Sequence, residues 1–306
     1  GRRRLDTHFD ALARMGISVS GRNSFIFNGS KLCASKILLD EASVTATENC
    51  LMAAVMAEGT TTIFNAACEP HVQDLCVLLN RMGARITGIG TNYLHVEGVR
   101  SLGGAEHEVS ADYIHAASFI AAAALTGGKL SIAGLQKHQM DVMELPFSKL
   151  GVCWQNGSGL LKLAPCQRRK IRNDFGSTIP RIEDGPWPAF PSDLMSVAIV
   201  LATQCSGTML FFEKMFESRM YFVDKLIEMG ARIIQCDPHR VIVAGPARLQ
   251  GSPLSSPDIR AGIAMVLAAL CADGESVIDN AQCIDRGYEK VEVALRKLGA
   301  DITRVA

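Results

Sequence analysis

The segment LNRMGARI at residues 79–86 recurs in the chain as a short apolar run that ends in a Met-Gly or Leu-Gly pair. The glycines of successive copies lie 67, 68, 79 and 69 residues apart. A glycine after an amphipathic run commonly ends a helix, so each copy predicts one amphipathic helix in a repeated unit. The five copies are LARMGI at 12–17, LNRMGARI at 79–86, FSKLGV at 147–152, LIEMGARI at 226–233 and LRKLGADI at 295–302.

A second repeated segment lies between these copies and keeps the same period. It starts at Gly59, Gly127, Gly207 and Gly274, at intervals of 68, 80 and 67 residues. Each of these glycines follows a helix-like run of small and branched residues and precedes a short Thr/Ile/Val/Phe run that predicts a strand. With the amphipathic helix and two further strands, the predicted unit is βαβαββ.

The first helix of each unit is apolar on nearly all sides, as in residues 116–125. Such a helix has to be buried all round. We therefore expect an α/β fold with parallel helices packed inside and an outer layer of sheet.

The repeat also predicts where the chain starts within a unit. The polar residue that opens the first helix precedes the Leu/Met-Gly marker by 40 residues in one unit, from Ser43 to Gly83. Gly16 has only 15 residues before it, so about 25 residues of its unit are expected to be absent. The alternative is a shortened capping repeat.

Composition and charge exclude several classes of protein. The chain has 31 basic and 31 acidic residues and a pI near 7.2, so no overall field favours nucleic acid or an anionic membrane. The longest apolar runs, 119–125 and 263–272, are shorter than the roughly 18 residues of a membrane-spanning helix. The arginines at 2–4 precede no apolar segment of the kind found in a signal peptide.

The cysteines and histidines show no pattern of a metal site. Ten cysteines occur without a Cys-x-x-Cys pair, and seven histidines are scattered. We expect buried free thiols in a reducing cytoplasm and no metal. The glycine-rich nucleotide-binding, metalloprotease and serine-hydrolase motifs are absent from the sequence.

A short polar residue stands before each apolar helix. The four are Ser43, Asp112, Asp193 and Asp258, and such residues commonly cap helix N-termini. Because the helices are expected to be parallel, their N-termini should emerge on one side of each domain and attract phosphate or carboxylate. Two domains facing each other in this way would form an anion-binding cleft.

Arginines lie near the same helix starts. Arg260 comes two residues after Asp258, and Arg286 follows the predicted strand 276–280. A single arginine is ordinarily a solvated surface residue, but a guanidinium group can bind a carboxylate or phosphate through two parallel hydrogen bonds. Together with Arg219, these residues predict a substrate that carries more than one negative charge.

Several motifs, in their order along the chain, closely resemble the UDP-N-acetylglucosamine 1-carboxyvinyltransferases, the MurA type of enolpyruvyl transferase in the EPSP synthase family. The resemblance covers all 306 residues. The motifs are GRRRLDTH at 1–8, LDEASVTATEN at 39–49, AACEPHVQDL at 66–75, PWPAFPSDL at 186–194, MFESR at 215–219, SPDIRAG at 256–262 and IDRGYE at 284–289.

The resemblance implies an inside-out α/β barrel of six βαβαββ units in two domains, with parallel helices inside and sheets outside. Residues 1–110 would be a partial first domain of about one and a half units, and residues 111–306 the second domain of three units. The reactive loop residue of the family, a cysteine or aspartate, and its phosphoenolpyruvate-binding lysine would precede Gly1. We therefore expect residues 1–306 alone to be inactive.

The activity implied is transfer of the enolpyruvyl group of phosphoenolpyruvate to the 3-hydroxyl of UDP-N-acetylglucosamine, with release of phosphate. This is the first committed step of peptidoglycan synthesis, in the cytoplasm. It proceeds by addition and elimination through a tetrahedral intermediate and requires no cofactor. The implied partners are these two small molecules, without nucleic acid or membrane.

The resemblance also implies roles for single residues. Asp193 is the candidate general base at the sugar hydroxyl; the alternative is that it only caps a helix. Arg3 and Arg286 would meet the phosphate of phosphoenolpyruvate, and Arg219 and Arg260 its carboxylate.

Other positions match orienting or substrate-contacting residues. Asp258 would orient the groups around phosphoenolpyruvate. Glu41 stands where many members carry a lysine that faces the diphosphate, and His115 stands where a glutamate is usual, so the acceptor sugar stays open. The nucleotide and sugar contacts would be Arg3, Arg4, Leu5, Asp6, Thr7, Ser43, Val44, Thr45 and Met215.

Two other functions are compatible with the same repeats. One is a non-catalytic paralogue that binds a nucleotide sugar. The other is a nucleic-acid enzyme, because RNA 3'-phosphate cyclases use related repeats. The neutral net charge and the lack of a basic stripe oppose the second alternative.

Overall fold

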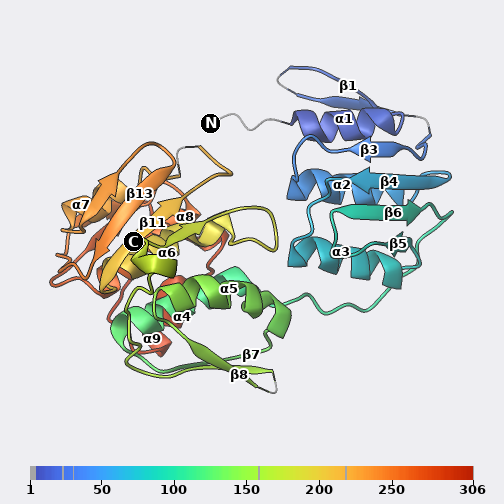
Figure 1. The fold of residues 1–306 in the computed structure, drawn as a ribbon. Coiled ribbons are helices and arrows are strands. Elements are labelled where there is room, and N and C mark those ends of the chain that lie inside the picture. Colours follow the sequence, from blue (N-terminus) through green and yellow to red (C-terminus); the bar gives the residue numbers. More distant parts are fainter. Residues whose placement is uncertain (1–4, 23, 30, 158, 218, 306) are drawn as a thin grey trace. The chain divides into compact units, whose positions relative to one another are not determined.

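The computed structural model describes residues 5–22, 24–29, 31–157, 159–217 and 219–305. Its contacts divide the chain into two compact units (Figure 1). Unit 1 consists of Gly1–Ser110 and Pro186–Pro188, and unit 2 of Ala111–Gly185 and Ala189–Ala306.

Unit 1 contains a helix with a hairpin, followed by one four-stranded sheet with two helices (Figure 1). The strand order in this sheet is β3-β4-β6-β5; β3 and β4 are parallel and the other pairs antiparallel. This is the order βαβαββ. The elements are α1 (Asp6–Arg14), β1 (Ser18–Ser20), β2 (Ile26–Asn28), β3 (Lys36–Leu38), α2 (Val44–Ala54), β4 (Thr60–Phe64), α3 (Pro70–Arg81), β5 (Arg85–Thr87) and β6 (Tyr93–Glu97).

The described residues of unit 2 form three sheets, of three, four and two strands. The first is β7-β9-β8, the second β10-β11-β13-β12 and the third β14-β15. In chain order the elements of the first sheet and its helices are α4 (Tyr113–Thr126), β7 (Leu130–Ala133), α5 (Lys137–Lys149), β8 (Trp154–Gly157) and β9 (Leu160–Leu163).

The second sheet of unit 2 has the same strand order as the sheet of unit 1, with β10 parallel to β11. The elements from here to the C-terminus are η1 (Phe175–Ser177), β10 (Arg181–Glu183), η2 (Ser192–Leu194), α6 (Met195–Thr203), β11 (Gly207–Phe212), α7 (Val223–Glu228), β12 (Ile233–Gln235), β13 (Arg240–Gly245), β14 (Pro253–Ser255), α8 (Ile259–Leu270), β15 (Val277–Asp279), η3 (Ala281–Arg286) and α9 (Val291–Lys297).

Two units of the repeat differ from the predicted βαβαββ order. In the described chain no strand opens the unit that begins with α4, whose sheet has three strands. The prediction of two strands after every amphipathic helix is wrong for α9, where only residues 300–305 of the described chain follow Gly299 and form no strand.

The core of unit 2 is formed by α4, α6 and α8, which contact one another. Every residue of α6 is buried, and α6 also contacts β11 and β13, whereas α4 contacts β7 and β9. The Ser196 hydroxyl on α6 donates a hydrogen bond of 2.9 Å to the carbonyl of Arg260 on α8. The first turns of these two helices therefore lie side by side.

A glycine at the end of a strand lets the sheet approach the chain at the C-terminal end of α2 in unit 1 and of α6 in unit 2. A Cβ on Gly98, after β6, would lie 1.5 Å from the carbonyl oxygen of Ala57. A Cβ on Gly245, at the end of β13, would lie 2.3 Å from the carbonyl oxygen of Cys205. Because backbone atoms cannot move aside, both positions of the repeat require glycine.

No helix in the described ranges is long and apolar enough to cross a membrane. The ten cysteines are free, but the expectation that they are buried holds only for Cys50, Cys76 and Cys205. The other cysteines lie in loops, near the ends of elements or, for Cys283, within the short helix η3, where the packed core covers them less. Four of them are exposed: Cys33, Cys153, Cys166 and Cys236.

Candidate functional site

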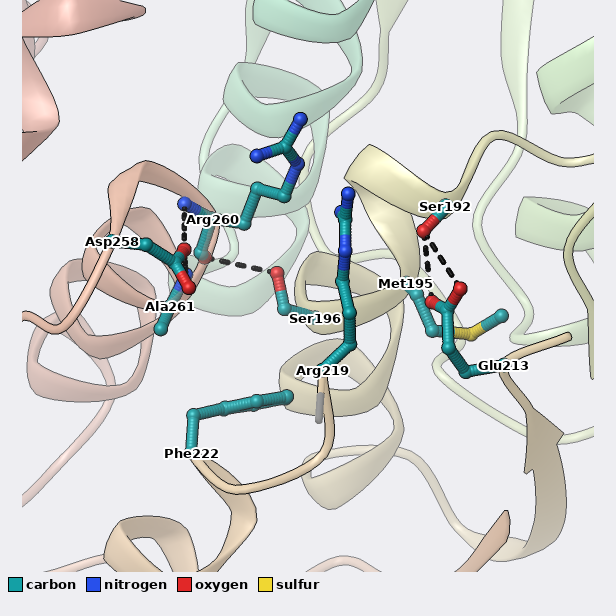
Figure 2. A pocket seen from close by; sticks show the side chains of 9 residues that line it. All are labelled: Ser192, Met195, Ser196, Glu213, Arg219, Phe222, Asp258, Arg260 and Ala261. Atoms are coloured by element: carbon teal, nitrogen blue, oxygen red, sulfur yellow. Dashed lines mark hydrogen bonds between the residues drawn. The ribbon is translucent and has the colours of Figure 1, made fainter. Parts of the chain in front are cut away.

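A small pocket lies in unit 2, at the first turns of α6 and α8 (Figure 2). The segment after β11 forms its remaining wall. Its polar side chains include two arginines whose guanidinium groups extend in the same direction. The lining residues are Ser192, Met195, Ser196, Glu213, Arg219, Phe222, Asp258, Arg260 and Ala261.

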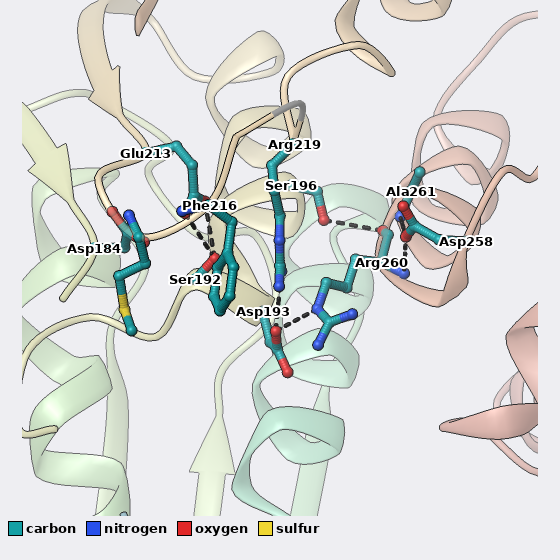
Figure 3. A network of polar contacts seen from close by, with 11 residues as sticks. Asp184, Ser192, Asp193, Ser196, Glu213, Phe216, Arg219, Asp258, Arg260 and Ala261 are labelled. Atoms are coloured by element: carbon teal, nitrogen blue, oxygen red, sulfur yellow. Dashed lines mark hydrogen bonds and ion pairs between the residues drawn. The ribbon is translucent and has the colours of Figure 1, made fainter. Parts of the chain in front are cut away.

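The Asp193 carboxylate joins the two arginines of this pocket (Figure 3). The same Asp193 oxygen accepts two hydrogen bonds, one of 3.0 Å from Arg219 and one from Nε of Arg260. The Asp193 side chain is 41% exposed, whereas those of Arg219 and Arg260 are 18% and 29% exposed. Three residues predicted for the site, from three separate elements, therefore lie in direct contact within a partly solvent-shielded cluster.

The two arginines determine the charge of Asp193. Burial raises the pKa of this carboxyl. The hydrogen bonds and positive charges of Arg260 and Arg219 lower it by more, so the pKa of Asp193 lies below its ordinary value. Asp193 is consequently ionised at neutral pH.

Asp193 does not cap a helix, which distinguishes it from the other polar residues predicted at helix starts. Ser43, Asp112 and Asp258 accept hydrogen bonds from backbone N–H groups at the starts of α2, α4 and α8. At α6 the cap position is Leu194, without a side-chain hydrogen bond, because the short helix η2 precedes α6. The capping alternative is wrong for Asp193, whose carboxylate binds arginine instead.

Asp258 acts on Arg260 through the backbone. Its carboxylate accepts hydrogen bonds of 2.8 Å from the N–H of Arg260 and 3.0 Å from that of Ala261. These bonds hold the first turn of α8, from which the Arg260 side chain extends toward Asp193 (Figure 3).

Three predicted residues of unit 2 do not themselves line this pocket: Asp193, which bonds to its two arginines, Arg286 and Met215. Arg286 is the last residue of η3, which packs against α8; a Cβ on the next residue, Gly287, would lie 3.0 Å from Ile259. Arg286 is therefore near the first turn of α8. The Met215 side chain is 36% exposed, and its backbone N–H donates a hydrogen bond of 3.3 Å to Asp184.

The structure adds polar residues that the sequence interpretation missed. The Ser192 hydroxyl lies 2.9 Å from both carboxylate oxygens of Glu213, which is fully buried. The Arg219 guanidinium lies over the ring of Phe216, 4.2 Å from its centre. A signal was present for Glu213, because it directly follows the strand predicted after Gly207.

Glu213 differs from Asp193 in its ionisation. Burial, together with the neighbouring carboxyl of Asp184, raises the pKa of Glu213 to about 8. The Ser192 hydroxyl and the charge of Arg219 oppose it. Glu213 is therefore mainly protonated at neutral pH.

In unit 1 the predicted nucleotide contacts lie at the starts of α1 and α2. Asp6 begins α1 after Leu5, and the Thr7 hydroxyl hydrogen-bonds to the carboxylates of Asp40 and Glu41. Arg3 and Arg4 lie outside the described residues.

The start of α2 is joined to α1 by a histidine. Ser43 caps α2 and Val44 is its first residue. The Thr45 hydroxyl lies 3.2 Å from Nε2 of His8, and the Asn49 amide lies 2.8 Å from Nδ1 of the same ring. The predicted residues of the two helices therefore belong to one hydrogen-bonded region. His8, which was not among the predicted contacts, is part of this region.

Comparisons with known proteins give the family. Residues 1–295 match the family "EPSP synthase (3-phosphoshikimate 1-carboxyvinyltransferase)". The UDP-N-acetylglucosamine 1-carboxyvinyltransferase of Treponema denticola is 53% identical over 302 residues, which are 99% of this chain and 71% of that protein. The enzyme of the same name from Bradyrhizobium diazoefficiens is 54% identical over 306 residues, 100% of this chain and 71% of that protein. The chain belongs to the UDP-N-acetylglucosamine 1-carboxyvinyltransferases.

Solved structures show the fold of this family. The structure of the enolpyruvyl transferase NikO from Streptomyces tendae superimposes on this chain with a TM-score of 0.87, at 22% sequence identity. The match covers 100% of this chain and 73% of the NikO chain. The EPSP synthase of Acinetobacter baumannii covers 97% with a TM-score of 0.74 at 16% identity, and 71% of it is matched. The chain therefore has the mixed α/β fold of the enolpyruvyl transferases.

Glu41 and His115 are the positions at which the sequence departs from the pattern expected of this carboxyvinyltransferase family. The exposed Glu41 lies 3.5 Å from the Thr7 hydroxyl. The His115 ring packs edge-on against Phe119 and Tyr288, with ring centres 4.7 and 5.2 Å apart. Glu41 therefore adds negative charge to the predicted nucleotide region, whereas His115 packs among aromatic rings.

Proposed function

We propose that the protein transfers the enolpyruvyl group of phosphoenolpyruvate to the 3-hydroxyl of UDP-N-acetylglucosamine, releasing phosphate, as the first committed step of peptidoglycan synthesis. Two relatives named UDP-N-acetylglucosamine 1-carboxyvinyltransferase are 53% and 54% identical to this protein over essentially the whole chain. The observation within the site that carries the proposal is the pair Arg219 and Arg260 on the carboxylate of Asp193.

The two arginines support the binding of a second carboxylate. Each donates to the same oxygen of Asp193, and they come from different elements of unit 2. Guanidinium groups pair with carboxylates through charge-assisted hydrogen bonds of defined geometry. The carboxylate of phosphoenolpyruvate has the same charge and shape as Asp193 and would compete with it for both arginines.

This competition would make Asp193 a better base only when phosphoenolpyruvate is bound. The arginines lower the pKa of Asp193, so a substrate that takes them over lets the pKa rise toward its ordinary range. A carboxylate freed in this way accepts the proton of the sugar 3-hydroxyl as that oxygen attacks. Asp193 and its arginines would then couple substrate binding to proton removal.

The chemical steps balance as an addition followed by an elimination. The hydroxyl oxygen forms a bond to C2 of phosphoenolpyruvate, while C3 gains a proton and the double bond becomes single. The bond between C2 and the phosphate oxygen then breaks, C3 loses a proton, and the double bond re-forms. Positive groups near the phosphate stabilise the charge that develops as it leaves.

The remaining residues take their proposed roles from the family pattern. Arg286, with Arg3, would hold the departing phosphate, and Asp258 would keep Arg260 in place through the first turn of α8. The nucleotide and sugar would contact Arg3 to Thr7, Ser43 to Thr45 and Met215. We also propose the family's inside-out barrel of two domains, 1–110 and 111–306, and a cytoplasmic location.

The proposal is tested by phosphate release from phosphoenolpyruvate and UDP-N-acetylglucosamine, using the protein as its gene encodes it. Asp193→Asn keeps the size of the side chain but cannot accept a proton, so we expect a loss of ~100-fold or more. Asp224→Asn, an exposed position on α7, is the matched control.

The outcomes separate the alternatives. Release that collapses only in Asp193→Asn supports both the reaction and the base. Tight binding of UDP-N-acetylglucosamine without any release by the wild type would instead indicate the non-catalytic nucleotide-sugar-binding paralogue.

A further inference from the structure

Two buried carboxyl groups, one of which lines the pocket, form a pair in unit 2. Asp184 directly follows β10 and Glu213 directly follows β11, and these parallel strands are in register at Glu183 and Phe212. Asp184 is 2% exposed and Glu213 is fully buried. The register of the sheet therefore places two acidic side chains next to each other at the carboxyl ends of adjacent strands.

The pair holds three successive backbone groups of the segment that leads to Arg219. The N–H groups of Lys214 and Met215 donate to the two oxygens of Asp184. The N–H of Phe216 donates to Glu213 at 3.2 Å. Because both carboxyls are buried, these bonds fix the start of the segment against the sheet.

Two contacts connect the pair to the Asp193 cluster. The hydroxyl of Ser192, the residue before Asp193, donates to Glu213. The ring of Phe216, whose N–H is held by Glu213, lies under the Arg219 guanidinium. Both partners of the Asp193–Arg219 ion pair are thus attached to the same buried acid.

We propose that Asp184 and Glu213 are positioning residues for enolpyruvyl transfer, which share one proton and hold Arg219 and Asp193 in their common geometry. The inference rests on the proposed function for its kinetic consequence. Neither residue is assigned contact with a reacting atom; both act through the backbone of 214–216 and through Ser192.

The charges around Glu213 explain why the pair needs a proton. Asp184 faces it from the end of β10, the charge of Arg219 lowers its pKa, and Nδ1 of His239 lies 2.9 Å from its backbone carbonyl oxygen. Lys214 does not neutralise the pair, because its ammonium pairs with Glu183 at 2.9 Å. With the pKa of Glu213 at about 8, loss of the shared proton in alkaline solution would leave two buried negative charges in contact.

Two substitutions test separately the effect of the shared proton and the effect of the hydrogen bonds to 214–216. Glu213→Gln resembles the protonated acid: its carbonyl can accept from Phe216 and Ser192, and its NH₂ can donate to Asp184. Asp184→Asn removes one of the two acceptors that hold 214 and 215. Glu217→Gln is the matched control, because Glu217 is an exposed carboxyl of the same segment.

The kinetic readout is the pH profile of kcat/KM for phosphoenolpyruvate, from about pH 6.5 to about pH 9.5, in the protein as its gene encodes it. We expect wild type and Glu217→Gln to lose activity above about pH 8, and Glu213→Gln to keep it. Asp184→Asn should lower kcat/KM by ~10- to 100-fold at all pH values, because a small displacement of Arg219 suffices. Its KM should rise more than its kcat falls.

The structural readout needs no activity. In the same protein, the backbone amide NMR signals of residues 214–216 should shift with a midpoint near the pKa of Glu213, about 8, and this titration should disappear in Glu213→Gln. If the wild type releases no phosphate yet these amides titrate, the proposed function fails and the shared proton stands. If the wild type is active but its amides do not titrate and its pH profile superimposes on that of Glu213→Gln, the positioning proposal is overturned.

Discussion

Gly262→Ala on α8 should disturb the contact between this helix and η3. A Cβ at this position would lie 2.4 Å from the Ser256 hydroxyl oxygen and 2.5 Å from Cγ1 of Ile284. Both neighbours are essentially fully buried, and the Ser256 hydroxyl is already bonded to the carbonyl of Asp258 at 3.0 Å. Neither side chain can turn away, so η3 has to move.

The expected cost follows from two opposing effects. Replacing glycine by alanine inside a helix stabilises it by ~1 kcal/mol. Forcing a methyl group into a packed interior destabilises by ~1–3 kcal/mol, and two contacts this short favour the upper half of that range. We expect Gly262→Ala to lower the free energy of unfolding of unit 2 by ~1–2 kcal/mol.

Urea unfolding followed by the fluorescence of Trp154, which is 8% exposed in unit 2, measures this change. Trp187→Phe serves as the background, because it removes the chain's second tryptophan. Gly157→Ala is the matched control, since no atom lies within 4 Å of the added Cβ. A Gly262→Ala protein as stable as its background, with an unchanged KM for phosphoenolpyruvate, would refute the close packing of η3 and its role in placing Arg286.

Three further predictions concern the site and its support. Arg219→Lys keeps the charge but loses the planar group that lies over Phe216, so the KM for phosphoenolpyruvate should rise ~10-fold or more while kcat changes less, as steady-state kinetics will show. Because the pKa of Glu213 is about 8 when folded and 4.5 in its ordinary state, the wild type should lose stability as pH rises between these values, by an amount on the order of 5 kcal/mol. Glu213→Gln should remove this contribution, as urea titrations at both pH limits will show. Gly245→Ala, which places a Cβ 2.3 Å from the Cys205 carbonyl oxygen, should yield little soluble protein, or a melting temperature well below that of wild type.

The repeat explains why so much of the fold was predictable. The apolar helices and the glycines that follow them are local patterns, and the periodic spacing aligned weak signals from several units. Three of the four predicted caps are present, at Ser43, Asp112 and Asp258, because capping depends only on a residue and its next few neighbours. The fourth failed at Asp193, where a short 3₁₀-helix precedes α6.

The sequence by itself determined the repeated units, the apolar helices and the family to which the chain belongs, because these depend on order and spacing along the chain. Only the tertiary structure decided that Asp193 contacts Arg219 and Arg260, which are 26 and 67 residues away. The same holds for the carboxyl pair of Asp184 and Glu213, which sheet register brings together. Charge and pKa depend on such distances in space, and these are set by packing between elements rather than by the pattern within any one of them.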